Sequence, residues 1–516
     1  MSGSANRWTT AVEVWTVLLA ALAFAVYKYC TYRYDYWKKR GVPHTRPTPL
    51  LGHFSGPVLR RAPLAYVVDD LYRKFAGHPC FGIYQARCPM LVVADTRLIN
   101  AVMCKDFGSF HDRLPSDVSF KTDPLFKNLL NLRGAQWKAV RSKLTAIFST
   151  AKLKNMYADM GVCIDGLVDK LQRLTPDGQA VINVNEVAAN FTVDTIGRCA
   201  FGLDFGALSN PDSEFRRIGR ISLENSSRKT ILELIRLADL GWLIDLFRLR
   251  ALPPEVFDFF INRFRELMEF RESDKDERND FISLLIKLRN EERASTSGED
   301  VVFTDEVLAS NAFVFFLAGF ETTSTTIGYC LYELALNPDV QTRLREELQR
   351  TAEANDGKFP YDSLKAMTYL DQVLNESLRV HPTVPAVART CNKTYTVPGT
   401  DITIDPGVKV LIPIYSLHHD SKYYENPDQF DPERFAEDKR ASRPPGCFLP
   451  FGDGPRICIG MRFGLMEAKA GLAEILSKFE VHPCERTPKT VELLPGSILL
   501  TPKNPIFLSF KRVQTK

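Results

Sequence analysis

Apolar residues recur at helical spacing over most of the chain between about Phe126 and Asn375. Shorter β-type runs lie before this stretch, in PCFGIY and MLVVAD, and after it, in NKTYTVPGTDITIDPGVKVLIPI, where proline and glycine mark turns. The runs do not alternate with helices as they would in βαβ units. The pattern therefore predicts a mainly α body with a small β region.

The longest predicted helix begins at about Thr304 and ends at Leu336, before Asn337-Pro338. At 1.5 Å per residue it is about 50 Å long, the width of a domain. Its apolar middle contains a glycine and a polar cluster, and one face of it carries Phe315, Ala318, Gly319 and Thr322. Two interpretations are open: a groove against which something flat or small rests, or a tight helix crossing with Thr322 bonded back to a carbonyl.

The N-terminal region carries an apolar run, VWTVLLAALAFAVY from Val14 to Tyr27, followed by several lysines and arginines. With the residues back to Thr9 it approaches the ~20 needed to span a bilayer, and the basic flank places the rest of the chain in the cytosol. A cleaved signal peptide or a buried core helix are the alternatives. We expect a membrane anchor over residues 1–27, a basic and proline-rich hinge acting as a semi-rigid spacer over 28–52, and a body over 53–516.

Composition narrows the classes of function. The chain has 516 residues with 66 basic and 62 acidic side chains, a net charge of +4 that is too small to indicate a nucleic-acid partner. Its eleven cysteines form no CxxC pair, which favours reduced thiols over a zinc site or a disulfide framework. The polar segment from Glu272 to Asp305 is expected to be an exposed connection between two helices.

One cysteine stands in an unusual frame, PFGDGPRICIG from Pro450 to Gly460. A thiolate that binds iron needs stabilisation by N–H groups at a helix start, and glycines allow the loop to approach a flat ring. We expect Phe451 to shield the sulfur of Cys458 from water and Arg456 to pair with a carboxylate. MRFGLMEAKAGLAEILSKFEV then predicts an amphipathic helix. The alternative is a buried, inert cysteine in a glycine-rich loop.

The order of residues Phe451, Gly454, Arg456, Cys458 and Gly460 resembles the haem-binding loop of the cytochrome P450 superfamily. Other segments resemble further motifs of that family: Ala318-Gly319-Phe320-Glu321-Thr322-Thr323, Glu376-Ser377-Leu378-Arg379, Pro432-Glu433-Arg434-Phe435 and Trp137-Lys138-Ala139-Val140-Arg141. The anchor and the proline hinge are similar to those of microsomal members. The segments AGFETTS, FLPFGDGPRICIG and MRFGLME are most like those of the microsomal insect group that metabolises foreign compounds.

This resemblance implies a triangular helical domain with haem b between the long helix and the loop of Cys458, the thiolate ligand. It implies that Thr322 and Glu321 deliver protons and that Ala318 and Gly319 leave room for O2. The haem propionates would be held by Arg456, Arg141, Trp137, Arg113 and Arg389. A structural triad would consist of Glu376, Arg379 and Arg434.

The chain shows no flavin or nicotinamide fingerprint, so the resemblance implies electrons from NADPH through a membrane-bound reductase, with cytochrome b5 as a second partner. Docking is expected over Cys458, at basic residues such as Lys138 and Lys143, in the endoplasmic reticulum membrane. The segment LGWLIDLFRLR either touches the bilayer or packs as a helix pair. Substrate contacts are expected from residues 113–133 and 205–250, Phe315 and residues 382–389.

The implied activity is insertion of one oxygen atom of O2 into lipophilic foreign compounds. Three alternatives stay open: an endogenous steroid, hormone or fatty-acid hydroxylase, a haem-thiolate isomerase that needs no reductase, and a haem-binding sensor. Glu321-Thr322 argues against the isomerase, which needs no proton relay.

Overall fold

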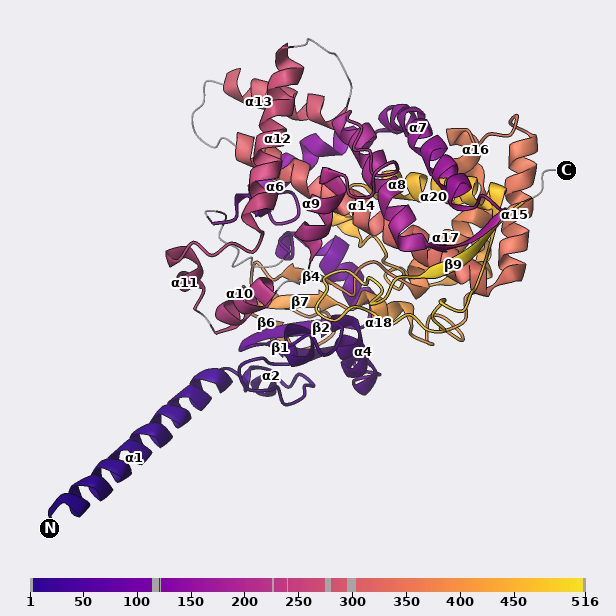
Figure 1. Cartoon of the computed structure of the whole chain (residues 1–516). Coiled ribbons are helices and arrows are strands. Elements are labelled where there is room, and N and C mark those ends of the chain that lie inside the picture. The colour runs from indigo at the N-terminus through magenta and orange to yellow at the C-terminus, as the bar shows by residue number, and fades with distance from the viewer. Residues whose placement is uncertain are drawn as a thin grey trace.

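The structure of the chain, a computed structural model, describes residues 3–113, 120, 122–224, 227–238, 240–273, 280–294 and 303–513. Within these ranges it is a mainly helical body with three small sheets, and the N-terminal helix stands apart from it (Figure 1). The predicted fold class is therefore confirmed. The helices are α1 (Gly3–Thr31), α2 (Tyr36–Lys39), α3 (Ser55–Val58), α4 (Leu64–Lys74), α5 (Thr96–Asn100), α6 (Gly134–Thr145), α7 (Thr150–Leu174), α8 (Val184–Ile196), α9 (Glu214–Leu223), α10 (Ser227–Leu237), α11 (Gly241–Leu246), α12 (Pro254–Ser273), α13 (Phe281–Ala294), α14 (Asp305–Leu336), α15 (Pro338–Glu353), α16 (Tyr361–Ala366), α17 (Thr368–Val380), α18 (Ile414–His418), α19 (Glu437–Ser442) and α20 (Met461–Lys478).

Helix α14 crosses the core, as its apolar sequence predicts. It begins where the Thr304 hydroxyl accepts a hydrogen bond from the Val307 N–H, and Asp305 and Glu306 occupy its first turn. It ends at Leu336, and after Asn337 the proline at position 338 opens α15. Helices α8, α12, α17 and α20 all pack against it, so α14 is the element around which the body is assembled.

The largest sheet has the strand order β1-β2-β7-β4, in which β2 and β7 are parallel and the other neighbours antiparallel. The strands are β1 (Cys80–Gln85), β2 (Cys88–Val93), β3 (Gln179–Asn183), β4 (Val387–Thr390), β5 (Tyr395–Thr396), β6 (Thr403–Ile404), β7 (Lys409–Ile412), β8 (Phe479–His482) and β9 (Phe507–Arg512). The second sheet has the order β3-β9-β8, and β5 pairs with β6. The β-type runs in the sequence form β1, β2, β5, β6 and β7, whereas β3, β4, β8 and β9 lie outside them.

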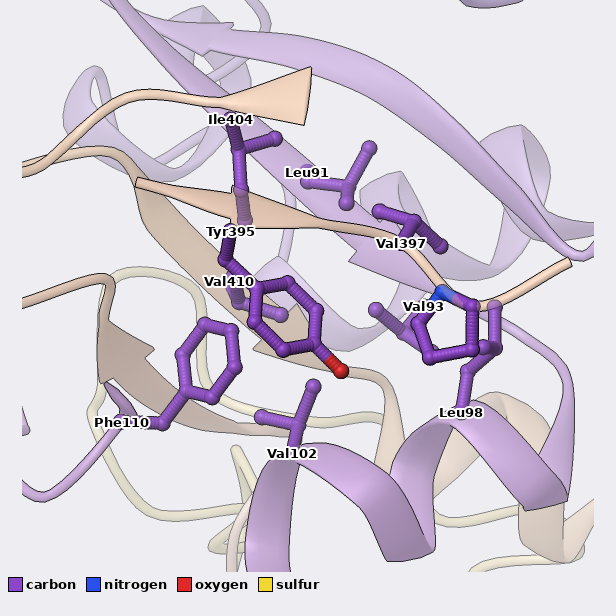
Figure 2. Close-up of a pocket in the computed structure, with 10 residues that line it drawn as sticks. Leu91, Val93, Leu98, Val102, Phe110, Tyr395, Val397, Ile404 and Val410 are labelled. Carbon is purple, nitrogen blue, oxygen red and sulfur yellow. The ribbon is translucent and has the colours of Figure 1, made fainter. Parts of the chain in front are cut away.

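A small apolar cavity of about 10 Å³ lies between the largest sheet and the β5–β6 pair (Figure 2). Tyr395 and Phe110 meet edge to face there, with ring centroids 4.7 Å apart, beside Leu91 and Val410. The Tyr395 hydroxyl donates a hydrogen bond to Asp106, so its polar end is satisfied. A space this small and this apolar is part of the core and not a binding site.

The segment expected to be a spacer is fixed to the body. Trp37 is fully buried, and a Cβ at position 82 of β1 would lie 2.4 Å from its ring, so only glycine fits there. The Gly82 N–H donates to the Pro43 carbonyl oxygen at 2.7 Å, and Val42 is buried. Helix α1 itself continues past residue 27 to Thr31. The proline-rich residues therefore follow the surface of the sheet, where His44 and Gly52 form isolated bridges with Gly82 and Gln85 of β1.

Two further expectations need correction. The segment from Glu272 to Asp305 is not only a connection, because it contains α13 between residues 281 and 294; residues 274–279 and 295–302 lie outside the described residues. Helix α20 is not simply amphipathic, because α7, α14 and α15 cover it and bury most of its circumference. It also ends at Lys478, and the residues FEV begin strand β8.

Candidate active site

A cavity of about 740 Å³ lies beside α14, the loop of Cys458 and the start of α20. Residues 383–388 and 496–499 supply much of its apolar wall. Nine of the residues expected at the site line this one cavity: Arg113, Trp137, Arg141, Ala318, Gly319, Thr322, Phe451, Arg456 and Cys458. Glu321 and Arg389 are not among its lining residues. The structure thus brings together residues that lie as far apart as 113 and 458 in the sequence.

The loop of Cys458 is closed by a hydrogen bond from the Cys458 N–H to the Phe451 carbonyl oxygen, at 2.9 Å. Gly452 and Gly454 have φ of +73° and +68°, a region that favours glycine. A Cβ at position 454 would lie 1.9 Å from the Met103 carbonyl oxygen. The close approach that requires Gly454 is therefore to the backbone at Met103, and not to a ligand in the cavity as the sequence suggested.

The Cys458 side chain is open to the cavity, yet it lies deep within the body. Burial raises the pKa of its thiol above the ordinary value. The N–H groups of Gly460 and Met461, at the start of α20, oppose that rise, and so do the charges of Arg113 and Arg141. This arrangement of donors and positive charges stabilises the thiolate, which is the form that binds a metal.

Buried arginines gather on one side of this cavity. Arg456 donates to the carbonyl oxygens of His111 and Leu132 at 2.6 and 2.9 Å, its guanidinium lies 4.1 Å from the Trp137 ring, and Arg113 donates to the Arg456 carbonyl oxygen. Burial and the neighbouring arginines lower the pKa of Arg456 to about 9.

Some of the N–H groups in this cluster have no partner. Arg113 Nε, Arg456 Nη1 and Arg389 Nε are buried without a hydrogen bond in the described chain. Arg389, on β4, is buried outside the cavity lining, and burial together with Arg113 lowers its pKa to about 10. An Asp112 carboxylate oxygen lies 3.5 Å from Nη2 of Arg456 and forms an ion pair with that guanidinium. The cluster therefore carries excess positive charge and idle donors, which an anionic ligand would satisfy.

The wall opposite Cys458 is formed by α14. The Thr322 hydroxyl donates to the Ala318 carbonyl oxygen at 2.7 Å. Gly319 lies where α14 crosses α8, and a Cβ there would be 2.8 Å from Cδ1 of Ile196. Thr322, Ala318 and Gly319 also line the cavity. Both interpretations of this face therefore hold at once: it is a tight helix crossing and it borders a groove.

Glu321 points to another side of α14. Burial raises the pKa of its carboxyl; the charge of Arg216 on α9 lowers it, and that of Glu186 on α8 raises it. Arg216 donates to Glu186 at 3.2 Å, and the Glu186 side chain is partly exposed. Glu321 therefore interacts electrostatically with charged groups that reach the surface between α8 and α9. Its side chain does not line the cavity.

Glu376 and Arg379, on α17, are both completely buried and form an ion pair at 2.8 Å. Arg434 Nε lies 3.3 Å from the same carboxylate, and the Asp431 N–H donates to it at 2.9 Å. Arg379 also donates to the His418 carbonyl oxygen. The three residues expected to form a triad are therefore in contact, and they join α17 to the segment that precedes the loop of Cys458.

Glu467 was not predicted as a site residue from the sequence. Its side chain lies fully buried on α20, and neither carboxyl oxygen has a hydrogen-bond partner in the described chain. Burial raises the pKa well above the ordinary value, opposed only by the hydroxyls of Thr323 and Thr195. Burial therefore favours the neutral carboxylic acid over the carboxylate at this position. The one available signal was an acid one helical turn after Phe463 on a face that is otherwise apolar.

Comparison with known proteins settles the family. A family model described as "Cytochrome P450" matches residues 42–510. The chain belongs to the cytochrome P450 family. It is 38% identical to "Probable cytochrome P450 6a14" of Drosophila melanogaster, over 93% of this chain and 96% of that one. It is also 38% identical to "Cytochrome P450 6a2" of the same organism, over 96% and 99%, and 37% identical to "Cytochrome P450 6k1" of Blattella germanica, over 96% of both chains.

As a cytochrome P450, the protein is a monooxygenase with haem as its cofactor and O2 as its co-substrate. The residues of the cavity fit haem. The Cys458 thiol faces an apolar space, with N–H groups and arginines beside it that favour its thiolate and oppose the effect of burial. Unpartnered arginine N–H groups lie beside the same space, where two propionates need donors. The insect relatives also agree with the resemblance of AGFETTS and FLPFGDGPRICIG.

Proposed function

We propose that this cytochrome P450 inserts one oxygen atom of O2 into lipophilic foreign compounds such as plant toxins or insecticides. The second oxygen atom leaves as water, and NADPH supplies the two electrons through a separate reductase. One observation carries the proposal: the wall of the cavity that faces Cys458 and Thr322 is largely apolar, with residues 383–388 and 496–499 contributing to it. Such a surface favours apolar molecules over polar metabolites.

In this proposal Cys458 would bind the haem iron through its thiolate, and Phe451 would shield its sulfur. Arg113, Arg141, Arg456 and Trp137 would hold the propionates, and Arg389 would add positive charge nearby. Haem bound in this way supplies the iron centre at which O2 is reduced and cleaved.

On the other wall, the Thr322 hydroxyl donates a hydrogen bond to the Ala318 carbonyl oxygen. Its own oxygen is thus left to accept a hydrogen bond from a water that delivers protons. Glu321 supplies these protons from the surface side, beside Arg216 and Glu186.

We further propose that α1 anchors the protein in the endoplasmic reticulum membrane with the body in the cytosol. Residues 12–31 of α1 form an apolar helix long enough to cross a bilayer, and almost none of it is buried against the body.

The reductase would bind over the loop of Cys458, where Lys138 on α6 is exposed. Lys143, on the same helix, lies 3.5 Å from Glu291. Lys138→Glu should therefore slow haem reduction by the reductase, whereas Lys365→Glu on α16 should not.

The decisive experiment is carbon-monoxide difference spectroscopy of the reduced protein, followed by turnover with NADPH and reductase. The wild type should give the red-shifted Soret band of thiolate-ligated haem and a hydroxylated product. Cys458→Ser should abolish the band, while Cys88→Ser, which alters an exposed thiol elsewhere, should retain it. Persistence of the band in Cys458→Ser would refute the ligand assignment. Turnover that does not depend on NADPH and reductase would refute the proposed reaction.

A further inference from the structure

The large cavity has an uneven distribution of charge. Its basic lining residues, Arg113, Arg141 and Arg456, accompany the loop of Cys458. In the described part of the chain, Glu233 is the one acidic residue that lines it. It lies on α10 (Ser227–Leu237), far from the motifs of the haem site in the sequence. A carboxylate that faces a largely apolar part of a cavity is a recognition element for a ligand.

The surroundings of Glu233 are mainly apolar. Helix α10 packs on α3, and Arg60 at the end of α3 donates to Thr230 at 3.1 Å. This side of the cavity is lined by Phe54, Pro57, Leu64 and Met90. Among these side chains Glu233 is partly buried, and burial raises the pKa of its carboxyl. Surroundings of low polarity disfavour a lone carboxylate. The same surroundings strengthen the attraction between the carboxylate and a positively charged group placed beside it.

Among the described residues, no positive group is in contact with the Glu233 carboxylate. Arg236, one turn further along α10, lowers the pKa of Glu233 through space, but no hydrogen bond or close ion pair reaches the Glu233 carboxylate from the described residues. The charge of Arg236 also acts on Asp123, whose carboxylate accepts a hydrogen bond from the Ala251 N–H. Glu233 is therefore open to a partner that enters through the cavity.

The position of α10 indicates where such a partner comes from. Just beyond the end of α10, the Ala238 carbonyl oxygen accepts a hydrogen bond from the Tyr29 hydroxyl, in the last turn of α1. The Glu233 helix thus lies against the base of the membrane-anchoring helix, on the side of the body nearest to α1 (Figure 1). A molecule with an apolar body and a cationic head, held at the bilayer surface, meets this side of the cavity first.

We propose that Glu233 selects lipophilic substrates that carry a cationic nitrogen, pairing with the ammonium group while the apolar remainder extends along the cavity towards Cys458. This inference rests on the proposed function, because it names the class of substrate for the same site. It makes Glu233 a specificity-determining residue that touches the substrate and not the reacting atoms. Compounds of this class include protonated tertiary amines and quaternary ammonium ions.

The test uses the full-length holoenzyme in phosphatidylcholine vesicles and a matched pair of probes. One probe is 4-phenylbutyltrimethylammonium, whose quaternary nitrogen cannot bind iron; the other is its neutral isostere, with carbon in place of nitrogen. Equilibrium dialysis at defined free concentrations gives both dissociation constants. The wild type should bind the cation at least tenfold more tightly than the isostere, because the carboxylate attracts the quaternary ammonium in surroundings of low polarity. Equal affinities in the wild type would overturn the inference without any variant.

Glu233→Gln removes the charge and keeps the shape. It should weaken binding of the cation roughly 10- to 100-fold and leave the isostere within about twofold. Glu233→Asp should retain most of the preference. Glu224→Gln, at the exposed end of α9, removes an equal charge outside the cavity and should change neither constant. An unchanged ratio in Glu233→Gln, or an equal loss in Glu224→Gln, would contradict the role of Glu233.

Failure of this inference is separable from failure of the proposed function. The carbon-monoxide band and NADPH-dependent oxidation of the neutral isostere report on the monooxygenase itself. If both persist while the preference for the cation is absent, only the assignment of Glu233 is wrong. If neither is seen in the wild type, the proposed function is wrong and the inference falls with it.

Discussion

Two glycines in the loop of Cys458 share a backbone conformation but have different neighbours. At position 452 a Cβ would meet only the end of the Met103 side chain, at 3.8 Å, whereas at position 454 it would lie 1.9 Å from the Met103 carbonyl oxygen. Gly452→Ala should therefore cost about 1 kcal/mol, the strain of a positive φ. Gly454→Ala should cost roughly 3 kcal/mol or more, because the loop must move.

Melting temperatures and the yield of the carbon-monoxide band per mole of protein measure this difference. Similar losses in the two variants would show that contact with Met103 does not hold the loop. The matched pair isolates that contact, since both substitutions add the same methyl group at almost the same φ.

A second residue-scale prediction concerns the buried carboxyl of Glu467. Its pKa is raised in the folded protein, so the folded state binds more protons than the unfolded state at any pH between the two values. The stability that this group contributes is complete below pH about 4.5 and falls by up to ~1.4 kcal/mol per pH unit as the pH rises towards the folded pKa. Glu467→Gln should therefore gain stability relative to the wild type between pH 6 and pH 8.

Melting temperatures of the two proteins at both pH values provide the measurement. Glu492→Gln is the control, because the Lys503 partner lowers the pKa of Glu492 and its contribution changes only in acid. A difference between Glu467→Gln and wild type that is the same at pH 6 and pH 8 would show that Glu467 is ionised in the folded protein.

The sequence anticipated the chemistry of single residues better than their surroundings. Cys458 could be identified because phenylalanine, glycines and arginine frame it at fixed offsets. The neighbour of Gly454 could not, since Met103 lies some 350 residues away along the chain and only the fold brings it there. Glu233 and Glu467 escaped notice for the same reason: an isolated acid in a helix is usually solvated, and its burial depends on what packs against it.

At the scale of elements, helix α14 was predictable almost to the residue because its cap, apolar middle and terminating proline are all local signals. Strands β3, β8 and β9 were not, because they lack a strong alternating pattern and because β3 pairs with β9 across more than 300 residues of chain. Strand β8 also follows α20 without a loop, so no turn residue marks the boundary. Local pattern predicts helices, whereas these strands depend on distant partners.

The crossing of α14 and α8 offers a test at this scale. Gly319→Ala would place a methyl group 2.8 Å from Cδ1 of Ile196, the end of a flexible side chain. The gain of about 1 kcal/mol in helix propensity should be outweighed by a packing cost of roughly 1–3 kcal/mol. Ile196→Val removes that Cδ1 atom and should cost about 1 kcal/mol alone.

In the double variant the two changes should compensate, so that it is more stable than the sum of the single effects by at least about 1 kcal/mol. Thermal or urea unfolding of the four proteins closes the cycle. Additive effects would mean that contact with Ile196 does not explain why glycine is required at this crossing.

At the scale of the whole molecule, the proposed attachment to the membrane would have two parts. Residues 12–31 form the apolar helix, but the last turn of α1 belongs to the body: the Arg87 guanidinium lies 3.9 Å from the Tyr29 ring, and Cys30 is buried. Near this point, α11 and the residue after it expose Trp242, Leu246 and Phe247, at 59–64% of their surface. The segment LGWLIDLFRLR was expected either to touch the bilayer or to pack as a helix pair. The body leaves these three apolar side chains of the segment uncovered.

Deletion of residues 2–27 separates the two parts, because it removes the apolar span and keeps Tyr29 in place. We expect this protein to stay folded, with its carbon-monoxide band intact, and still to bind phospholipid vesicles through α11, since each large apolar side chain contributes roughly 1.5–3 kcal/mol when buried. Adding Trp242→Ser and Phe247→Ser should lower the fraction that floats with vesicles at least tenfold. Ile498→Ser, an exposed apolar residue at the cavity wall, is the control and should have no such effect. If the shortened protein with α11 intact does not bind vesicles, α11 is not a membrane contact and α1 alone forms the anchor.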